Sequence, residues 1–477
     1  MSVIKNKMNT VREYVQTHRV TRFVFSHRWL AFFYGIFLCL YEMAYLRSSI
    51  SAVHPVLIFW AAVVIAYDLF IGGAFRRMPY TKLLFLFLGF AALSTAVNVK
   101  TGGMTDIKAW ILTVISLLAF LPACREGTDS AGRKRTLFFV LSGFLGISFL
   151  ASFASDTLFF LDFYEKLTTP ERTYFLGVHN GGIWGVTLFG VYADSNHAAA
   201  FSAVSGLLSF ALLSECRKGV FSSAKRRGWI KGFAIANIAV QTIYFPLANS
   251  RGGWLSLGAA VALTAFLFCL FRFKKKEGFK RIAVSLLASV LVVSACCGTL
   301  LLSRTVSTEI YLNYCYEKPE ESDGRFSFHK EDSDFTGSGR TGIWQEALIV
   351  SSHHPVIGIG TNSAEHYAKL YVEENLAEKH GNFSLTHGKA VHNSYLDVLL
   401  SYGLLGFLSL MSFFVLCMIR ILRRLKQAPN EGLSTFLIIC AAVVLCCSAF
   451  FLSCMFIGTT ATYYLELILV GYLVSAE

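Results

Sequence analysis

Charged side chains are scarce in this sequence. Asp, Glu, Lys and Arg make up only 15% of its 477 residues, whereas hydrophobic types make up 55%. The mean hydropathy is +0.54, and soluble domains carry about 25% charged residues. This composition excludes an ordinary soluble domain of this length. It predicts an integral membrane protein whose backbone polar groups are satisfied within helices.

Several common catalytic and ligand-binding signatures are also missing. The sequence has no Walker phosphate loop, no HExxH or CxxC pair, no EF-hand spacing and no internal repeat. The tandem pair His353 and His354 precedes a proline and has no further ligands at a suitable spacing. We therefore expect no metal site and no cofactor.

Cysteines are present but do not suggest a framework of disulfides. Most of the twelve lie in apolar runs, where they behave as small hydrophobic residues. The largest polar segment contains only Cys315, whose pairing with Cys454 is left open. The basic N-terminal residues 1–28 lack a signal-peptide layout, so the first apolar segment is expected to remain as an anchor.

Long apolar runs dominate what is there. About twelve approach the roughly 20 residues that a transmembrane helix needs. The continuously apolar run 433–475 leaves the count of the last two spans open. The predicted spans are 29–46, 55–73, 80–97, 107–123, 137–154, 196–214, 230–248, 253–271, 282–302, 393–419, 434–452 and 457–475.

The basic residues give these spans a direction. With the N-terminus inside the cell, every short cytoplasmic loop is basic, as the positive-inside rule requires. Both termini are then cytoplasmic, and the net charge of +13 reflects topology rather than nucleic-acid binding. The cytoplasmic segments are 1–28, 74–79, 124–136, 215–229, 272–281 and 420–433.

Two long polar segments fall on the outer side, residues 155–195 and 303–392. In the second, the acidic stretch 317–334 is expected to be mobile or solvated. An amphipathic helix is predicted from residue 341, ending before Pro355. Its apolar face carries Ile343, Ala347 and Val350.

A second amphipathic helix is predicted to follow and to run to about residue 380. Asn362 and Glu365 have the spacing of a capping box, and Gly381 supplies a stop. The expected apolar stripe of this helix is Tyr367, Leu370 and Tyr371. Two such helices would form a lid, either one that only packs or one that covers a substrate pocket.

Two arginines at the outer surface are candidates for anion binding. Arg251, in NSRGGW, lies at the outer end of a span, against the usual inner bias for basic residues. Arg340 lies just before the first lid helix, where helix N-terminal N–H groups also favour an anion. Guanidinium grips phosphate with two parallel hydrogen bonds. The plainer alternatives are a snorkelling Arg251 and a solvent-exposed Arg340.

Two further polar sites begin predicted spans. Asn196 and His197 follow Asp194 and Ser195, one of which is expected to cap the helix. His392 and Asn393 stand where the outer segment gives way to an apolar helix. A histidine, whose pKa is ordinarily near 6.5, can accept a proton at neutral pH. The alternative role for His392 is at a cap or an interface, and Asn393 is expected to cap the helix.

The order of these motifs resembles the O-antigen ligase and O-antigen polymerase superfamily of bacterial polysaccharide assembly. NSRGG is followed by GRTGIWQEAL, HPVIGIGTN and HNSYLDVLLSYGLLG, and GVYADSNHAAA is similar to an asparagine-containing element of that family. The resemblance covers roughly residues 190–475. It divides the chain into N-terminal transmembrane helices, 1–189, and an O-antigen ligase-like core, 190–477, that includes the outer loop 303–392.

The resemblance implies an all-α polytopic membrane protein with a C-type glycosyltransferase-like fold. It implies a metal-independent transfer of an oligo- or polysaccharide from a polyprenyl-diphosphate carrier to an acceptor hydroxyl. The transfer would occur on the outer face of the bacterial cytoplasmic membrane. Arg251 and Arg340 then bind the diphosphate and His392 is the catalytic histidine, while Asn196 and Asn393 line the substrate site.

Two questions stay open at this point. The sequence does not separate a ligase, which moves a finished chain to a lipid, protein or glycan acceptor, from a polymerase of lipid-linked repeats. A non-enzymatic transporter or flippase of lipid-linked glycan is the alternative. It would use intramembrane carboxylates such as Asp68 and Glu466, with Glu42 nearer the end of a span. These carboxylates form no obvious relay, and the two halves show no repeat.

Overall fold

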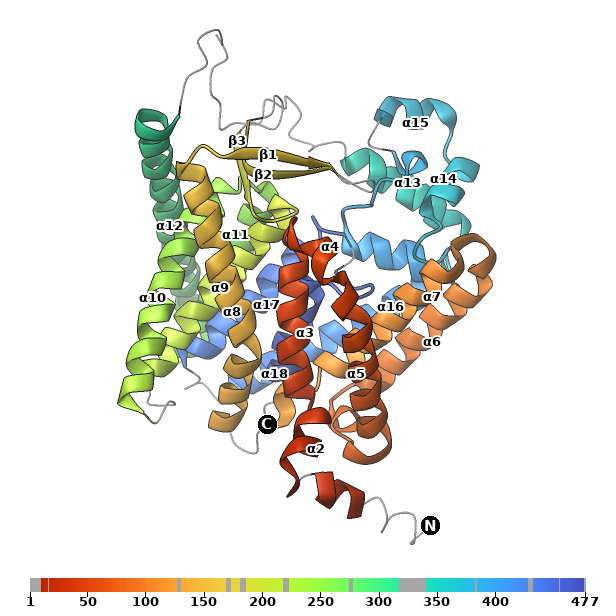
Figure 1. Ribbon diagram of the computed structural model, residues 1–477, viewed down its shortest axis with the longest axis horizontal. Helices are drawn as coiled ribbons and strands as arrows, with labels where there is room; N and C mark the ends of the chain where they lie inside the picture. Colours follow the sequence, from red (N-terminus) through yellow and green to blue (C-terminus); the bar gives the residue numbers. More distant parts are fainter. Residues whose placement is uncertain are drawn as a thin grey trace.

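The computed structural model describes most of the chain as a helical bundle with a cap of short elements at one end (Figure 1). The predicted acidic stretch 317–334 and Cys454 lie outside the described residues. The described residues are 10–15, 17–126, 130–168, 173–180, 186–217, 223–273, 278–316, 340–381, 384–427, 432–453 and 455–475.

Each predicted span coincides with a helix of the bundle, with α5 continuing into a π-helical turn. The bundle helices are α3 (His27–Tyr41), α5 (His54–Tyr67), α6 (Thr81–Val97), α7 (Val99–Ile115), α8 (Ser130–Phe160), α9 (Ser195–Arg217), α10 (Ala224–Leu247), α11 (Arg251–Arg272), α12 (Gly278–Ile310), α16 (Ser394–Gln427), α17 (Leu433–Ser448) and α18 (Ala461–Ser475). Short helices α2 (Arg19–Val24) and α4 (Leu46–Ile50) flank α3.

Within the described residues, eight helical segments are long and apolar enough to cross a membrane. This confirms a polytopic membrane protein, while the count of twelve stays a prediction. Helices α6, α17 and α18 are apolar but shorter, and α3 has 15 residues. The run 433–475 does divide into two helices, α17 and α18.

Helix α18 forms the centre of the bundle. Every residue from Ala461 to Ser475 is buried, and α18 packs against α3, α8, α16 and α17. A Cβ atom on Gly471 would overlap the backbone carbonyl of Leu121, so glycine is required for this close packing. The twelfth apolar segment is thus a core helix surrounded by protein.

A small antiparallel sheet occupies the first long polar segment, residues 155–195, and the all-α prediction did not include it. Strand β2 (Thr173–Asn180) lies between β1 (Tyr164–Thr168) and β3 (Val186–Gly190), with a register irregularity at Gly177 and Val178. Tyr174, Leu176 and Val178 form its buried face. The sheet leads directly into α9 and thereby fixes where that helix begins.

The second outer segment contains the predicted first lid helix and two shorter ones. Helix α13 (Arg340–His353) ends before Pro355 and buries the predicted face of Ile343, Ala347 and Val350. The single second helix was wrong: the chain forms α14 (Ala364–Tyr371) and α15 (Glu374–His380), which ends at Gly381 as predicted.

The predicted capping box is also absent from α14. Its N-cap is Ser363, which makes no side-chain cap hydrogen bond. The Asn362 amide instead donates to Asp106 at 3.0 Å, and Glu365 pairs with Lys369 one turn later. Leu370, placed on the apolar stripe, is 60% exposed. The Asn362 side chain therefore bonds to the Asp106 carboxylate of the bundle instead of forming a capping box with Glu365.

Helix α16 is kinked at Gly403, and the turn after α13 packs into the kink. Gly403 has φ 64° and Gly358 has φ 78°. A Cβ on Gly358 would lie 2.5 Å from the Gly403 nitrogen, and one on Gly403 would overlap the Val356 carbonyl. Gly360 N–H donates to the Ser401 carbonyl at 2.9 Å. Glycine at position 403 therefore permits close packing of the turn after α13 against α16.

The two ends of the bundle are different in kind (Figure 1). The sheet and α13–α15 lie together at one end, and both chain termini lie at the other. Helices α9, α11 and α16 each begin at the end that carries the sheet and α13–α15, which is called the capped end below. All predicted site residues belong to that end.

Candidate functional site at the capped end

Arg251 is the first residue of α11 and is exposed. The preceding Ser250 caps the helix, since its hydroxyl accepts the Gly253 N–H at 3.1 Å. Asn249, before that, has a left-handed backbone with φ 51°. This sharp turn between α10 and α11 presents the Arg251 side chain at the capped end.

The two glycines after Arg251 permit close packing. A Cβ on Gly252 would lie 2.8 Å from Phe451 Cγ, in the loop between α17 and α18. A Cβ on Gly253 would lie 3.0 Å from Ala199 Cβ on α9. Both glycines are buried. They bring the start of α11 against two other segments of the site.

Asn196 links the start of α9 to the start of α11. Its Oδ1 accepts a hydrogen bond of 2.8 Å from Ser250 Oγ, next to Arg251. Asp194 caps α9, as its Oδ1 accepts the N–H of Asn196 at 2.8 Å and of His197 at 3.4 Å. Of the two predicted caps, Asp194 and Ser195, the structure selects Asp194. The Asn196 carboxamide is thus held beside the arginine.

Arg340 begins α13 and is half-buried. Burial lowers the pKa of its guanidinium, and the negative charge of nearby Asp194 acts in the opposite direction. Within the described residues, neither Arg340 nor Arg251 forms an ion pair or a hydrogen bond through its guanidinium. The guanidinium N–H groups of Arg251 and Arg340 can therefore donate hydrogen bonds to a ligand beside the Asp194–Asn196 turn.

His392 has a left-handed backbone, with φ 52°. This conformation is costly for a residue with a side chain, and such strain is concentrated at functional sites. Its N–H donates to Ser453 Oγ at 2.7 Å, which fixes the residue to the loop between α17 and α18. The imidazole is half-buried.

Asn393 caps α16, as expected. Its Oδ1 accepts the N–H of Tyr395 at 3.1 Å and of Leu396 at 3.2 Å. Ser394 Oγ then donates to the Leu452 carbonyl at 2.6 Å and accepts the Met455 N–H at 3.0 Å. The segment after His392 is thus bound at several points to the loop that also packs on Gly252.

Trp344 connects the remaining pair of segments. It lies one turn after Arg340 on the same face of α13, and its Nε1 donates to the Val391 carbonyl at 3.0 Å. Val391 immediately precedes His392. Each of the four backbone segments of the site therefore contacts at least one of the others, directly or through the loop between α17 and α18. These segments carry Arg251, Arg340, His392 and Asn196.

A polar cluster from the N-terminal helices holds the lid turn and was missed by the sequence reasoning. Asp106 of α7 is fully buried and accepts hydrogen bonds from Thr361 Oγ1 and the Asn362 N–H, both at 2.8 Å. Ser94 Oγ bonds the Ser401 carbonyl at 2.6 Å. Asp106 had a usable signal, since it is an acidic residue at the start of an apolar segment.

Glu346 anchors the other side of the lid. Its buried carboxylate accepts bonds from His380 Nδ1 at 2.6 Å, Ser384 Oγ at 2.9 Å and the Leu385 N–H at 2.7 Å. His353 stacks on Tyr371 with ring centroids 4.1 Å apart, and His354 Nε2 lies 3.2 Å from the Tyr371 hydroxyl. The tandem histidines thus have aromatic partners within the lid.

The intramembrane carboxylates have separate local partners. Asp68 lies 3.6 Å from His27 Nε2 and accepts the N–H groups of Ala74 and Phe75 at 2.6 and 2.7 Å. Glu466, on the core helix α18, accepts from Cys446 Sγ at 3.0 Å. Each carboxylate joins neighbouring segments, and nothing in these contacts favours a transport path.

Comparison with known proteins bears on this end of the bundle. Residues 236–411 match the family model described as O-antigen ligase. The matched segment contains Arg251, Arg340, His392 and Asn393, and Asn196 precedes it. An uncharacterised protein of Haemophilus influenzae is 23% identical over 326 residues, which cover 63% of this chain and 75% of that relative.

Proposed function

We propose that this chain, which belongs to the O-antigen ligase superfamily, transfers an oligo- or polysaccharide from a polyprenyl-diphosphate carrier to an acceptor hydroxyl. The reaction takes place at the capped end, on the outer face of the bacterial cytoplasmic membrane. One observation carries the proposal: the segments that bear Arg251, Arg340 and His392 contact one another around the Asp194–Asn196 turn.

The charge at this end suits a diphosphate. Four helices, α9, α11, α13 and α16, begin here, and helix N-termini attract anions. Arg251 and Arg340 add two guanidinium groups that can each bind phosphate oxygens in pairs. In this proposal the two arginines hold the donor diphosphate at the membrane interface while the polyprenyl chain stays in the bilayer.

The chemistry is a substitution at the anomeric carbon of the donor glycan. The acceptor oxygen forms a bond to that carbon, and the bond from the carbon to the diphosphate oxygen breaks. Polyprenyl diphosphate leaves with the electron pair, and the arginines stabilise its growing negative charge. His392 accepts the proton of the acceptor hydroxyl or orients that hydroxyl for attack.

The lid has a matching role in excluding water. Helices α13–α15 are held to the bundle through Asp106 and are braced internally through Glu346. A closed and dry site favours transfer to the acceptor over hydrolysis of the donor. We further propose that residues 190–477 form the catalytic core, and that the outer loops together with residues 1–189 select the acceptor.

A turnover assay in proteoliposomes tests the proposal. Lipid-linked oligosaccharide is supplied with and without a pool of cell-extract acceptors, and both released polyprenyl diphosphate and glycan size are followed. Wild type is expected to release carrier while His392→Ala protein of equal abundance is nearly inactive. Lengthening of the lipid-linked glycan without added acceptor identifies a polymerase, and dependence on the pool identifies a ligase.

Two results would count against the proposal. Intact donor after incubation with wild type, across a range of lipid-linked glycans, argues against catalysis. Equal turnover by the His392→Ala protein argues against the assigned site. His366→Ala is a matched control, because His366 is an exposed lid histidine on α14 outside the set of contacts around the arginines.

A further inference from the structure

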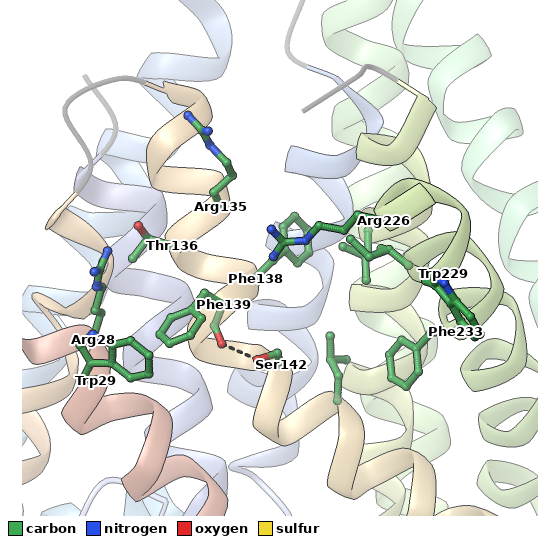
Figure 2. A pocket seen from close by; sticks show the side chains of 13 residues that line it. Arg28, Trp29, Arg135, Thr136, Phe138, Phe139, Ser142, Arg226, Trp229 and Phe233 are labelled. Atoms are coloured by element: carbon green, nitrogen blue, oxygen red, sulfur yellow. Dashed lines mark hydrogen bonds between the residues drawn. The ribbon is translucent and has the colours of Figure 1, made fainter. Parts of the chain in front are cut away.

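A cavity lies at the opposite end of the bundle from the candidate site, at the end that carries both termini. Its volume is about 710 Å³. The beginnings of α3, α8 and α10 form its walls, and Figure 2 shows side chains from all three helices facing it. Leu212 of α9 completes the lining. No residue of this cavity belongs to the candidate site at the capped end.

The cavity is strongly positive. Arg28, Arg135 and Arg226 line it, one from each of the three helices, and all three lie within the first two turns of their helices. The 13 described residues that line it include no Asp or Glu. Three helix N-termini add to the positive potential. This combination attracts an anionic group.

The nearest carboxylate on the α9 wall is already neutralised. Glu215 lies one turn beyond Leu212 on α9 and is buried. It pairs with Lys134 Nζ at 3.0 Å and also accepts from Ser434 Oγ. Lys134, which does not line the cavity, therefore supplies a counter-charge for Glu215.

The inner part of the cavity is apolar and aromatic. In Figure 2 the rings of Trp29, Phe139 and Phe233 lie lower in the view than the guanidinium group of Arg135. Trp29 and Phe139 pack edge to face with centroids 4.7 Å apart. Trp229, at the rim, is 75% exposed. Tryptophans and arginines at this depth are typical of the membrane interface.

We propose that this cavity binds an anionic diacyl phospholipid of the membrane leaflet at the end that carries the termini. The headgroup phosphate contacts the guanidinium groups of Arg28, Arg135 and Arg226, and the acyl chains lie along the aromatic inner part. Basic pockets between transmembrane helices bind anionic headgroups in this way.

Both halves of the cavity are needed for this assignment. A free phosphate has no apolar part to contact the aromatic inner side chains. A neutral phospholipid has no net negative charge to pair with the three arginines. The cavity joins α3, α8 and α10 at their ends, so a bound lipid ties these helices together. The proposal does not depend on the transfer reaction, because it concerns the opposite end of the bundle.

Quenching of tryptophan fluorescence tests the proposal on the full-length protein in neutral detergent. Phosphatidylglycerol with brominated acyl chains is titrated, since bromine quenches Trp29 and Trp229 on contact. Arg226→Gln and Arg135→Gln are each expected to weaken binding about fivefold, the usual effect of one basic residue near an anionic lipid. Trp229→Phe should remove a large part of the quenching.

Arg227→Gln is the matched control. Arg227 carries the same charge on the same helix as Arg226 and does not line the cavity. Its substitution should change lipid affinity less than twofold. Brominated phosphatidylcholine should bind at least tenfold more weakly than phosphatidylglycerol, and millimolar inorganic phosphate should not displace the lipid.

Four outcomes would overturn the proposal. Equal quenching by phosphatidylcholine would mean a non-specific detergent-like contact. Equal loss in Arg227→Gln would mean a general charge effect. Displacement by inorganic phosphate would mean a simple anion site, and stronger competition by polyprenyl phosphate would mean a carrier-lipid site. If Arg226→Gln fails to fold, the exposed Arg135 carries the test alone.

Discussion

Trp344 Nε1 donates a hydrogen bond of 3.0 Å to the backbone carbonyl of Val391. This single bond joins the helix of Arg340 to the residue before His392. The tryptophan orients the lid helix relative to the histidine.

Removing that bond should loosen the site without unfolding the protein. Trp344→Phe keeps an aromatic ring, although a smaller one, and loses the donor, which costs about 1 kcal/mol for one hydrogen bond. We expect turnover to fall roughly fivefold while thermal stability changes little. Leu348→Ala on the same helix is the control, since Leu348 is 51% exposed. Equal losses of turnover in Trp344→Phe and Leu348→Ala would show that the Trp344 hydrogen bond does not orient α13 relative to His392.

The contact between Gly358 and Gly403 predicts a large effect of one methyl group. Gly358→Ala places a Cβ 2.5 Å from the Gly403 nitrogen, in a left-handed backbone. We expect a loss of about 1–3 kcal/mol in stability, measured by thermal unfolding, together with a loss of turnover. Gly298→Ala in α12 meets nothing within 4 Å, so it should be neutral or stabilising. Tolerance of Gly358→Ala would refute the packing described here.

Asp106 should control how tightly the lid is held. Asp106→Ala removes the acceptor for Thr361 and Asn362 and leaves their donors without it, which costs about 1–3 kcal/mol. We expect faster proteolysis within residues 355–363 and a larger share of donor hydrolysis relative to transfer. The two can be measured on the same reconstituted sample. An unchanged cleavage rate would show that other contacts hold the turn.

Arg251 and Arg340 should bind the lipid-linked donor through the planar shape of the guanidinium group as well as through its charge. Arg251→Lys and Arg340→Lys keep the charge but lose the paired donors. We expect the KM for the lipid-linked donor to rise about tenfold in each, as one charge-assisted bond is lost. Arg47→Lys is the control at the capped end, because the Arg47 guanidinium lies 4.5 Å from the centre of the Tyr41 ring and is not part of the candidate site. If the donor KM of one variant did not change, the arginine replaced in that variant would not bind the diphosphate.

Local patterns were sufficient to predict the bundle helices and α13, but not the division between α14 and α15. Apolar runs predicted the helices of the bundle. The spacing of apolar residues predicted the buried face of α13, which consists of Ile343, Ala347 and Val350. The sheet was missed because its strands are short and only the face of Tyr174, Leu176 and Val178 is buried. Neither result depended on contacts between distant residues.

What could not be predicted depends on tertiary contacts. The Asn362–Glu365 spacing favoured a capping box, but Asp106, distant in sequence, takes the Asn362 side chain. Gly252 packs against Phe451, and Glu346 accepts hydrogen bonds from His380 and Ser384. These contacts join separate segments of the chain, so no local pattern predicts them.

His392 allows the most direct test of the central claim, because its backbone conformation separates folding from chemistry. Glycine adopts φ 52° without strain, so His392→Gly should fold at least as stably as wild type. Asparagine also tolerates this conformation, so His392→Asn is a second variant with a polar side chain that is not a base. Thermal unfolding of both variants establishes that the site is intact.

The deciding measurement is the rate of polyprenyl diphosphate release by wild type, His392→Gly and His392→Asn in proteoliposomes with lipid-linked glycan and acceptor. Both variants are expected to remain folded and to lose at least about 100-fold in rate, the usual contribution of a general base. Folded variants that release carrier at the wild-type rate would contradict the assignment of His392 as the residue that activates the acceptor.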